Sequence, residues 1–157
     1  MQNTTSSERG FGITELVVVM GLIGVLSVFA VPNLLSYYQS SSLTAGTEQL
    51  AAVLTRARHL AVNRNTSVCV ERVGTTVRLR LATCAGDVWT GTQATGIVTS
   101  STGIIQIAND LNVGGATNAI FTNAGGASTP ATYTVTDPKT NRSRSVVVTS
   151  TGRVSIQ

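Results

Sequence analysis

A single carboxylate stands out in the N-terminal part of this chain because it lies inside an apolar run. Glu15 comes near the start of that run, and the sixteen residues from Leu16 to Val31 carry no charge. A charge is costly to place in a membrane-length apolar segment, and a residue that is kept there usually has a function. Glu15 is therefore predicted to have a function in this segment, although a side chain that simply reaches to the lipid headgroups is an alternative.

A second group of charges lies near the C-terminus, between residues 139 and 153. Its members are Lys139, Arg142, Arg144 and Arg153, and Asp137 is the one acid beside them. Arg142 and Arg144 are two residues apart, so on a strand they point the same way. Paired guanidiniums suit phosphate oxygens, which provide affinity for nucleic acid without reading its sequence. An edge strand kept soluble by positive charge is the alternative, and the charges alone do not decide between the two.

Residues for catalysis or metal binding are scarce. His59 is the only histidine, charged residues make up 11% of the chain, and the formal net charge is +4. No nucleophile and base, and no set of ligands at metal-binding spacing, can be assembled from these residues. We therefore predict that the protein is not an enzyme and that it has no catalytic residue, metal or cofactor.

The two cysteines, Cys69 and Cys84, favour a disulfide formed in an oxidising compartment. Alternating apolar residues predict a hairpin around Gly74–Thr75, in which Cys69 faces Arg80. Cys84 then lies four residues further along, ~13 Å away, which is too far for a bond. Either the chain turns back after residue 81, or the loop is longer, or the thiols stay unpaired. We favour the turn-back, over residues 82–86.

The first element that positions these residues is a long helix. The apolar segment 11–35 would span ~30 Å of hydrocarbon at ~1.5 Å per residue. Apolar residues then recur at spacings of three and four from Leu43 to Ala61, which predicts an amphipathic helix. We expect one helix from about Phe11 to about Val62, with a kink or local melting near Pro32. Gly46 is expected to weaken it.

The second element is a small β domain over residues 65–157. Short apolar clusters among Gly, Thr, Ser and Asn predict two or three strands between residues 90 and 130. The C-terminal part predicts three more strands, at residues 133–136, 143–149 and 153–156. The fold class is therefore α+β, with a long N-terminal helix packed on a small antiparallel sheet domain.

Four N-terminal residues, Gly10, Phe11, Glu15 and Pro32, coincide with the apolar run at fixed spacing. They resemble the signature of type IV prepilins and type II secretion pseudopilins. The resemblance implies that a prepilin peptidase cleaves after Gly10 and methylates the new N-terminal residue, Phe11. Glu15, as the fifth mature residue, would pair with the ammonium group of an adjacent subunit, and Pro32 falls where pilins often carry proline.

A second resemblance covers the C-terminal part of the helix and the residues after it. The pairs Ala57-Arg58 and Ala61 with Arg64, followed by Trp89 and Gly91, are similar to the FimT and GspH branch of minor pilins and pseudopilins. The implied organisation is a cleaved leader (1–10), a membrane-spanning and assembly segment (11–38), an amphipathic segment (39–64) and a periplasmic, then extracellular, β domain (65–157).

The resemblance also implies a function and partners. A FimT-like minor pilin is a single-pass inner-membrane protein that joins other pilins in an extracellular type IV pilus. Such pilins end in Gly-Arg-x-Arg, which helps to bind double-stranded DNA during natural transformation. Here Gly152-Arg153 is followed by Val154 and Ser155, so either DNA is not bound or Arg142 and Arg144 take over the contact. The alternative is an H-type minor pseudopilin that contacts secreted proteins.

Overall fold

The computed structural model describes residues 12–91, 102–107 and 111–157, apart from the side chains of residues 29–33, 35 and 36. The chain divides into two compact units, Met1–Tyr38 and Gln39–Gln157. Each unit is described separately below.

The helix α1 runs from Ile13 to Arg64, close to the predicted range. It is unbroken at Pro32, so the local melting expected there is not observed. Its end is a Schellman motif, in which Asn65 adopts a φ of 49° and Thr66 donates its N–H to the carbonyl of Ala61 at 3.1 Å. Asparagine is one of the few residues that tolerate this left-handed conformation, so the helix ends there.

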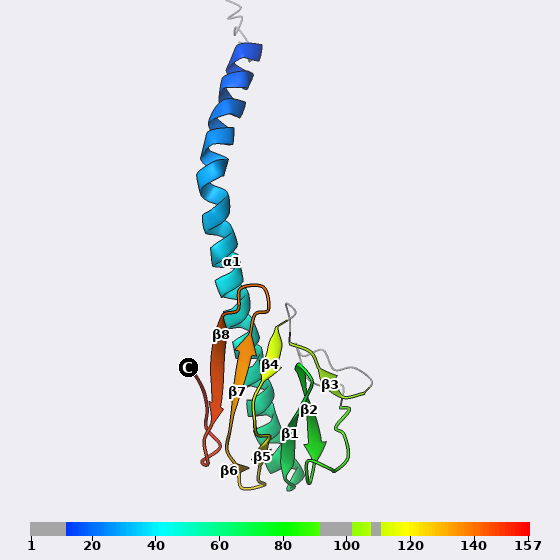
Figure 1. The fold of residues 1–157 in the computed structure, drawn as a ribbon. Coiled ribbons are helices and arrows are strands. Elements are labelled where there is room, and N and C mark those ends of the chain that lie inside the picture. The colour runs from blue at the N-terminus through cyan, green and yellow to red at the C-terminus, as the bar shows by residue number, and fades with distance from the viewer. Residues whose placement is uncertain (1–11, 92–101, 108–110) are drawn as a thin grey trace, which may run out of the picture. The chain divides into compact units, whose positions relative to one another are not determined.

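The first sheet has five antiparallel strands in the order β3-β2-β1-β5-β6 (Figure 1). They span Val68–Val73 (β1), Thr76–Leu81 (β2), Ile104–Ile105 (β3), Ala119–Phe121 (β5) and Ala127–Thr129 (β6). The β1–β2 hairpin has the predicted register, in which Val70 faces Leu79 and Cys69 faces Arg80. Gly74, at a φ of 60°, makes the tight turn. The alternation of apolar residues therefore fixed which face of the hairpin is buried.

The second sheet has four antiparallel strands in the order β4-β7-β8-β9. They span Asn112–Gly114 (β4), Ala131–Thr136 (β7), Ser143–Val148 (β8) and Val154–Ile156 (β9). The three strands predicted near the C-terminus are confirmed to within two residues. Between residues 90 and 130, however, the described residues form four short strands, where two or three were expected.

One hydrophobic core joins both sheets to the second half of α1. The helix buries one stripe of side chains, and Figure 1 shows this part of the helix running behind strands of both sheets. The stripe consists of Leu43, Leu50, Val53, Leu54, Ala57 and Ala61. Gly46 belongs to the same buried face, because a Cβ at this position would collide with the side chain of Leu111. Gly46 therefore allows close packing between the helix and Leu111. The sequence alone predicts only that this glycine weakens the helix.

Tyr133 links the two sheets from inside this core. Its side chain is fully buried, and its hydroxyl donates to the carbonyl of Val70 at 2.8 Å. The same oxygen accepts the N–H of Ala119 at 2.8 Å. Val70 and Ala119 form the last residue pair between β1 and β5. The hydroxyl therefore satisfies two backbone groups at the point where these two strands separate. One side chain of the second sheet therefore completes the hydrogen bonding of the first.

We predict that Tyr133→Phe lowers the free energy of unfolding by about 2 kcal/mol, because it leaves a buried carbonyl and a buried N–H unpaired. Urea denaturation measures this change. Tyr38→Phe is the matched control, since Tyr38 is exposed, and it should shift the free energy by less than about 0.5 kcal/mol.

The same substitution should alter the pH dependence of stability. Burial raises the pKa of Tyr133 to about 12, above the value of about 10 in an unfolded chain. The folded state then holds its phenolic proton more tightly, so stability falls as the pH rises from about 10 to about 12. Tyr133→Phe should lack this part of the loss. Equal alkaline losses in both proteins would contradict the role given to Tyr133.

Candidate functional site

The Met1–Tyr38 unit presents an apolar surface without a cover. Every side chain that the structure describes between residues 12 and 28 is exposed, including Ile13 at 84% and Val28 at 70%. Apolar surface of this extent in one continuous segment marks a contact with lipid or with another protein. Glu15 is exposed within this segment, in the first turn of α1.

The other residues predicted for processing and assembly are only partly covered by the structure. Gly10 and Phe11 lie outside the described residues. Pro32 lies within α1, and its side chain is outside the description. In the part of the chain that is described, no helix combines the length and the hydropathy needed to cross a membrane. The membrane span predicted over residues 11–38 therefore stays a prediction.

The basic residues near the C-terminus are held by a turn built around Asp137. This carboxylate accepts the N–H of Lys139 at 2.9 Å and the hydroxyl of Thr140 at 2.8 Å. The backbone closes the turn, with the N–H of Asp137 donating to the carbonyl of Arg142 at 2.9 Å. The hydrogen bonds from Lys139 and Thr140 hold the pKa of Asp137 below its usual value. The only acid of the turn is thus directed inward.

Three of the four predicted cations lie at this turn, and all three are exposed: Lys139, Arg142 and Arg144. Arg144 also donates from Nη1 to the hydroxyl of Thr44 on α1 at 3.3 Å, which ties the turn to the helix. Arg142 precedes β8 by one residue, so it does not share a strand with Arg144. Together we call these three residues the basic turn.

Arg153 is separated from the basic turn by the length of β8. Its carbonyl accepts the N–H of Thr149, which follows the far end of that strand. Thr149 lies five positions after Arg144 in the sequence, which corresponds to ~17 Å along a strand. The sequence predicted one cluster of four cations, and the structure brings together three of them.

Gly152, which precedes Arg153, has a structural role. It adopts a φ of 77°, and a Cβ there would collide with the carbonyl oxygen of Gly125. Arg58, from the Ala-Arg pair on α1, donates from Nε to that same carbonyl at 2.7 Å. Arg58 and Gly152, two of the residues named for the family resemblance, therefore meet at the Gly125 loop although they lie far apart in the sequence.

The disulfide predicted between Cys69 and Cys84 is present, with a Cα–Cα distance of 5.1 Å. The chain turns back after Leu81, as favoured from the sequence. The N–H of Leu81 donates to the carbonyl of Asp87, and the N–H of Trp89 donates to the carbonyl of Leu79. This return brings Cys84 within bonding distance of Cys69, whose side chain is fully buried.

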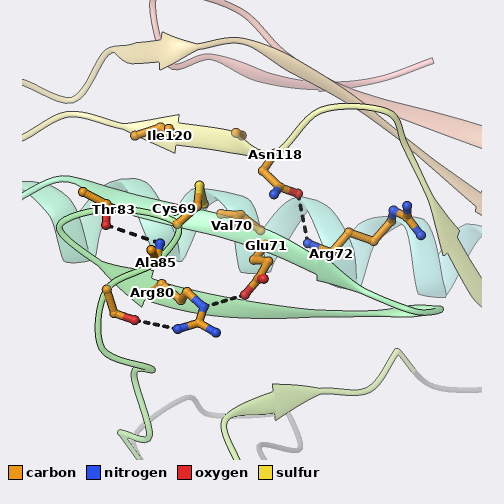
Figure 2. Close-up of a disulfide and its surroundings, with 12 residues drawn as sticks. Cys69, Val70, Glu71, Arg72, Arg80, Thr83, Ala85, Asn118 and Ile120 are labelled. Atoms are coloured by element: carbon orange, nitrogen blue, oxygen red, sulfur yellow. Dashed lines mark hydrogen bonds and ion pairs between the residues drawn. A yellow bond between two sulfur atoms is a disulfide. The ribbon is translucent and has the colours of Figure 1, made fainter.

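A charged cluster beside the disulfide was not foreseen from the sequence. Glu71 accepts hydrogen bonds from the Nε atoms of Arg78 and Arg80, both at 2.6 Å. Arg80 also donates to the carbonyl of Gly86, so it joins β1 to the returning loop (Figure 2). The bond from Arg78 is the main cause that lowers the pKa of Glu71. The hairpin register, which sets Glu71 opposite Arg78, was the signal that could have revealed this cluster.

Trp89 packs in the hydrophobic core. Its side chain is 8% exposed, and Arg56 of α1 lies over its ring, with Cζ 5.6 Å from the centroid. His59 is exposed on the same helix and borders an open groove of about 520 Å³ beside Trp89. Among the described residues, no three His, Cys, Asp or Glu side chains lie close enough together to hold a metal ion.

The comparison with protein families decides the family. The model of the family described as "Type II transport protein GspH" matches residues 46–152, more than half of the chain. The chain belongs to the GspH family. No curated protein sequence matches it.

Solved structures show the same fold. The type IV minor pilin FimU of Pseudomonas aeruginosa is 17% identical, with a TM-score of 0.55, over 77% of this chain and 92% of FimU. The minor pseudopilin EpsH of the Vibrio cholerae type 2 secretion system is 11% identical, with a TM-score of 0.55, over 74% of this chain and 96% of EpsH. The predicted pilin-like α+β fold is therefore confirmed for this GspH-family chain.

We predict that Gly152→Ala lowers the free energy of unfolding of this GspH-family domain by at least ~2 kcal/mol, because a methyl group would meet the Gly125 carbonyl in a strained conformation. Gly74→Ala is the matched control. It also has positive φ, but a Cβ there meets no atom within 4 Å, so it should cost about 1 kcal/mol. Equal costs in urea denaturation would contradict the packing role of Gly152.

Proposed function

We propose that this protein is a minor subunit of a type IV pilus that assembles through residues 11–38. The observation that supports it most is the continuous exposed apolar surface of α1 together with Glu15. In the inner membrane, lipid covers this surface before assembly. In the fibre, the corresponding helices of other pilins cover it instead, so the same residues suit both environments.

Processing by a prepilin peptidase, with cleavage after Gly10 and methylation of Phe11, creates the charge that Glu15 needs. The new ammonium group at Phe11 and the Glu15 carboxylate of an adjacent subunit attract each other strongly in a medium of low dielectric constant. Either charge alone is costly there. The pair therefore favours insertion of a subunit beside an existing one, and it sets the register between the two.

The basic turn is the proposed contact for double-stranded DNA taken up in natural transformation. Lys139, Arg142 and Arg144 are exposed, and among the described residues none of the three forms an ion pair with an acid. Such cations bind phosphate oxygens without sequence preference, so the binding should be weak and salt-dependent. Arg153 lies far enough along the sheet to act as a separate contact.

A second candidate is an H-type minor pseudopilin that contacts secreted proteins. It is favoured by the family description, which names type II transport, and by the similarity of the fold to EpsH. Deletion of the gene distinguishes the two functions. Loss of DNA uptake and twitching with normal secretion supports the pilus, and loss of secretion alone supports the pseudopilin.

We predict that Glu15→Ala reduces incorporation of the subunit into sheared fibres at least tenfold, because the Phe11 ammonium of a neighbour loses its partner. Immunoblotting of the fibre and membrane fractions measures this. Glu48→Ala is the control, since Glu48 is exposed on the amphipathic part of α1, and it should assemble normally. Normal assembly of the Glu15 variant would contradict the proposed contact.

We predict that the double variant Arg142→Gln, Arg144→Gln weakens duplex DNA binding about tenfold at low salt. Removal of two phosphate contacts should also lower the slope of log K against log salt by about 2. Gel shifts over a series of salt concentrations measure both values. Arg153→Gln, at the other end of β8, is the control and should have the smaller effect. An unchanged gel shift in the double variant would exclude the basic turn as the DNA contact.

A further inference from the structure

The basic turn lies beside the first residues of the Gln39–Gln157 unit. Arg144 donates to the hydroxyl of Thr44, and that hydroxyl donates to the carbonyl of Ser40 at 3.0 Å. Figure 1 shows the β7–β8 connection next to α1 at this end of the unit. About one helical turn, from Ser40 to Thr44, therefore separates the Arg144 guanidinium from the start of the unit.

The distance from this point to the proposed membrane segment is limited by the chain itself. Ser40 follows Tyr38 by two residues, and even a fully extended chain spans only ~7 Å over that length. Tyr37 and Tyr38 are 73% and 68% exposed, and aromatic residues of this kind favour the interface between membrane and water. If residues 11–38 span the bilayer, the basic turn lies close to the headgroups whatever the orientation of the two units.

The charges of the turn suit an anionic surface. The turn carries three positive charges and one negative charge, that of Asp137, whose carboxylate accepts hydrogen bonds within the turn. Arg144 uses one of its five N–H groups for Thr44, which leaves donors for phosphate oxygens. Attraction of basic residues to anionic lipids acts within a Debye length of the surface, ~8 Å at physiological salt.

We propose that the basic turn binds the anionic phospholipid headgroups of the membrane in which the subunit waits before assembly. The proposal rests on the membrane-anchored function proposed above. Lipid contact would hold the β domain against the bilayer, and extraction into the fibre would release Lys139, Arg142 and Arg144. DNA could contact the turn only after that release, so the two ligands belong to different stages.

Lys139 provides the measurement, because it is the only lysine in the chain. The full chain is reconstituted in nanodiscs of phosphatidylcholine, with or without phosphatidylglycerol, and the acylation rate of Lys139 by an amine-reactive reagent is followed by mass spectrometry. We expect acylation to be at least fivefold slower in the anionic discs. A high salt concentration should restore the faster rate, since it screens the contact.

Two variants test which residues make the contact. Arg142→Gln, Arg144→Gln should remove most of the protection of Lys139 in anionic discs. Arg153→Gln removes the same kind of charge at the other end of β8 and should leave the protection intact. Loss of protection only in the double variant supports the proposal, and equal behaviour of the two variants would overturn it.

Other outcomes also decide the question. Equal acylation rates in both kinds of disc, or protection only when duplex DNA is added, would overturn the lipid contact and leave the pilus function standing. A chain that enters neither kind of disc would contradict the membrane-anchored function itself, and the lipid contact with it. Normal assembly of Glu15→Ala would contradict the Glu15 contact in the fibre alone, without bearing on Lys139.

Discussion

The second half of α1 carries the apolar stripe on which both sheets of the domain pack. Leu50, Leu54 and Ala57 are fully buried, and the inner faces of the two sheets close over them in one core. Neither sheet is large, and several of their strands have only two or three residues, so neither could bury enough apolar surface alone. Tyr133 then joins the sheets at the point where β1 and β5 separate. The side chains that the structure describes between residues 12 and 28 of the same helix are exposed, and they form the surface that lipid and other pilins are proposed to cover.

Two carboxylates outside this core, Asp137 and Glu71, decide which of the nearby arginines and lysines are paired with an acid and which are not. Asp137 satisfies the backbone of its own turn, so the cations around it face the solvent. Glu71 does the opposite, because it binds both Arg78 and Arg80 and so neutralises part of the first sheet's surface. Of the two arginine-rich regions, the basic turn is therefore the one that is available for a phosphate-bearing partner, whether that partner is lipid or DNA.

Local patterns in the sequence predicted the elements whose residues repeat regularly, and they missed contacts between distant segments. The alternation of apolar residues across Gly74 predicted the hairpin register. In that register a continuous strand would place Cys84 ~13 Å from Cys69, so a disulfide required the chain to turn back, as it does. Strands of two or three residues, such as β3 and β4, have too few residues for a period, so their number was underestimated. The bridging role of Tyr133 and the packing of Gly152 on Gly125 depend on tertiary contacts, which no local pattern encodes. The separation of Arg153 from Arg144 could have been deduced, since a predicted strand lay between them.

The central claim is that Phe11 becomes the amino terminus of a subunit whose helix moves from the membrane into a fibre, with Glu15 as its docking charge. Intact-mass and N-terminal peptide analysis of the protein recovered from sheared surface fibres tests this claim most directly. The account predicts a chain that begins at N-methylated Phe11 and retains the Cys69–Cys84 bond. A full-length chain that still begins at Met1 in cells with an active prepilin peptidase, or the absence of the protein from the fibres, would contradict it.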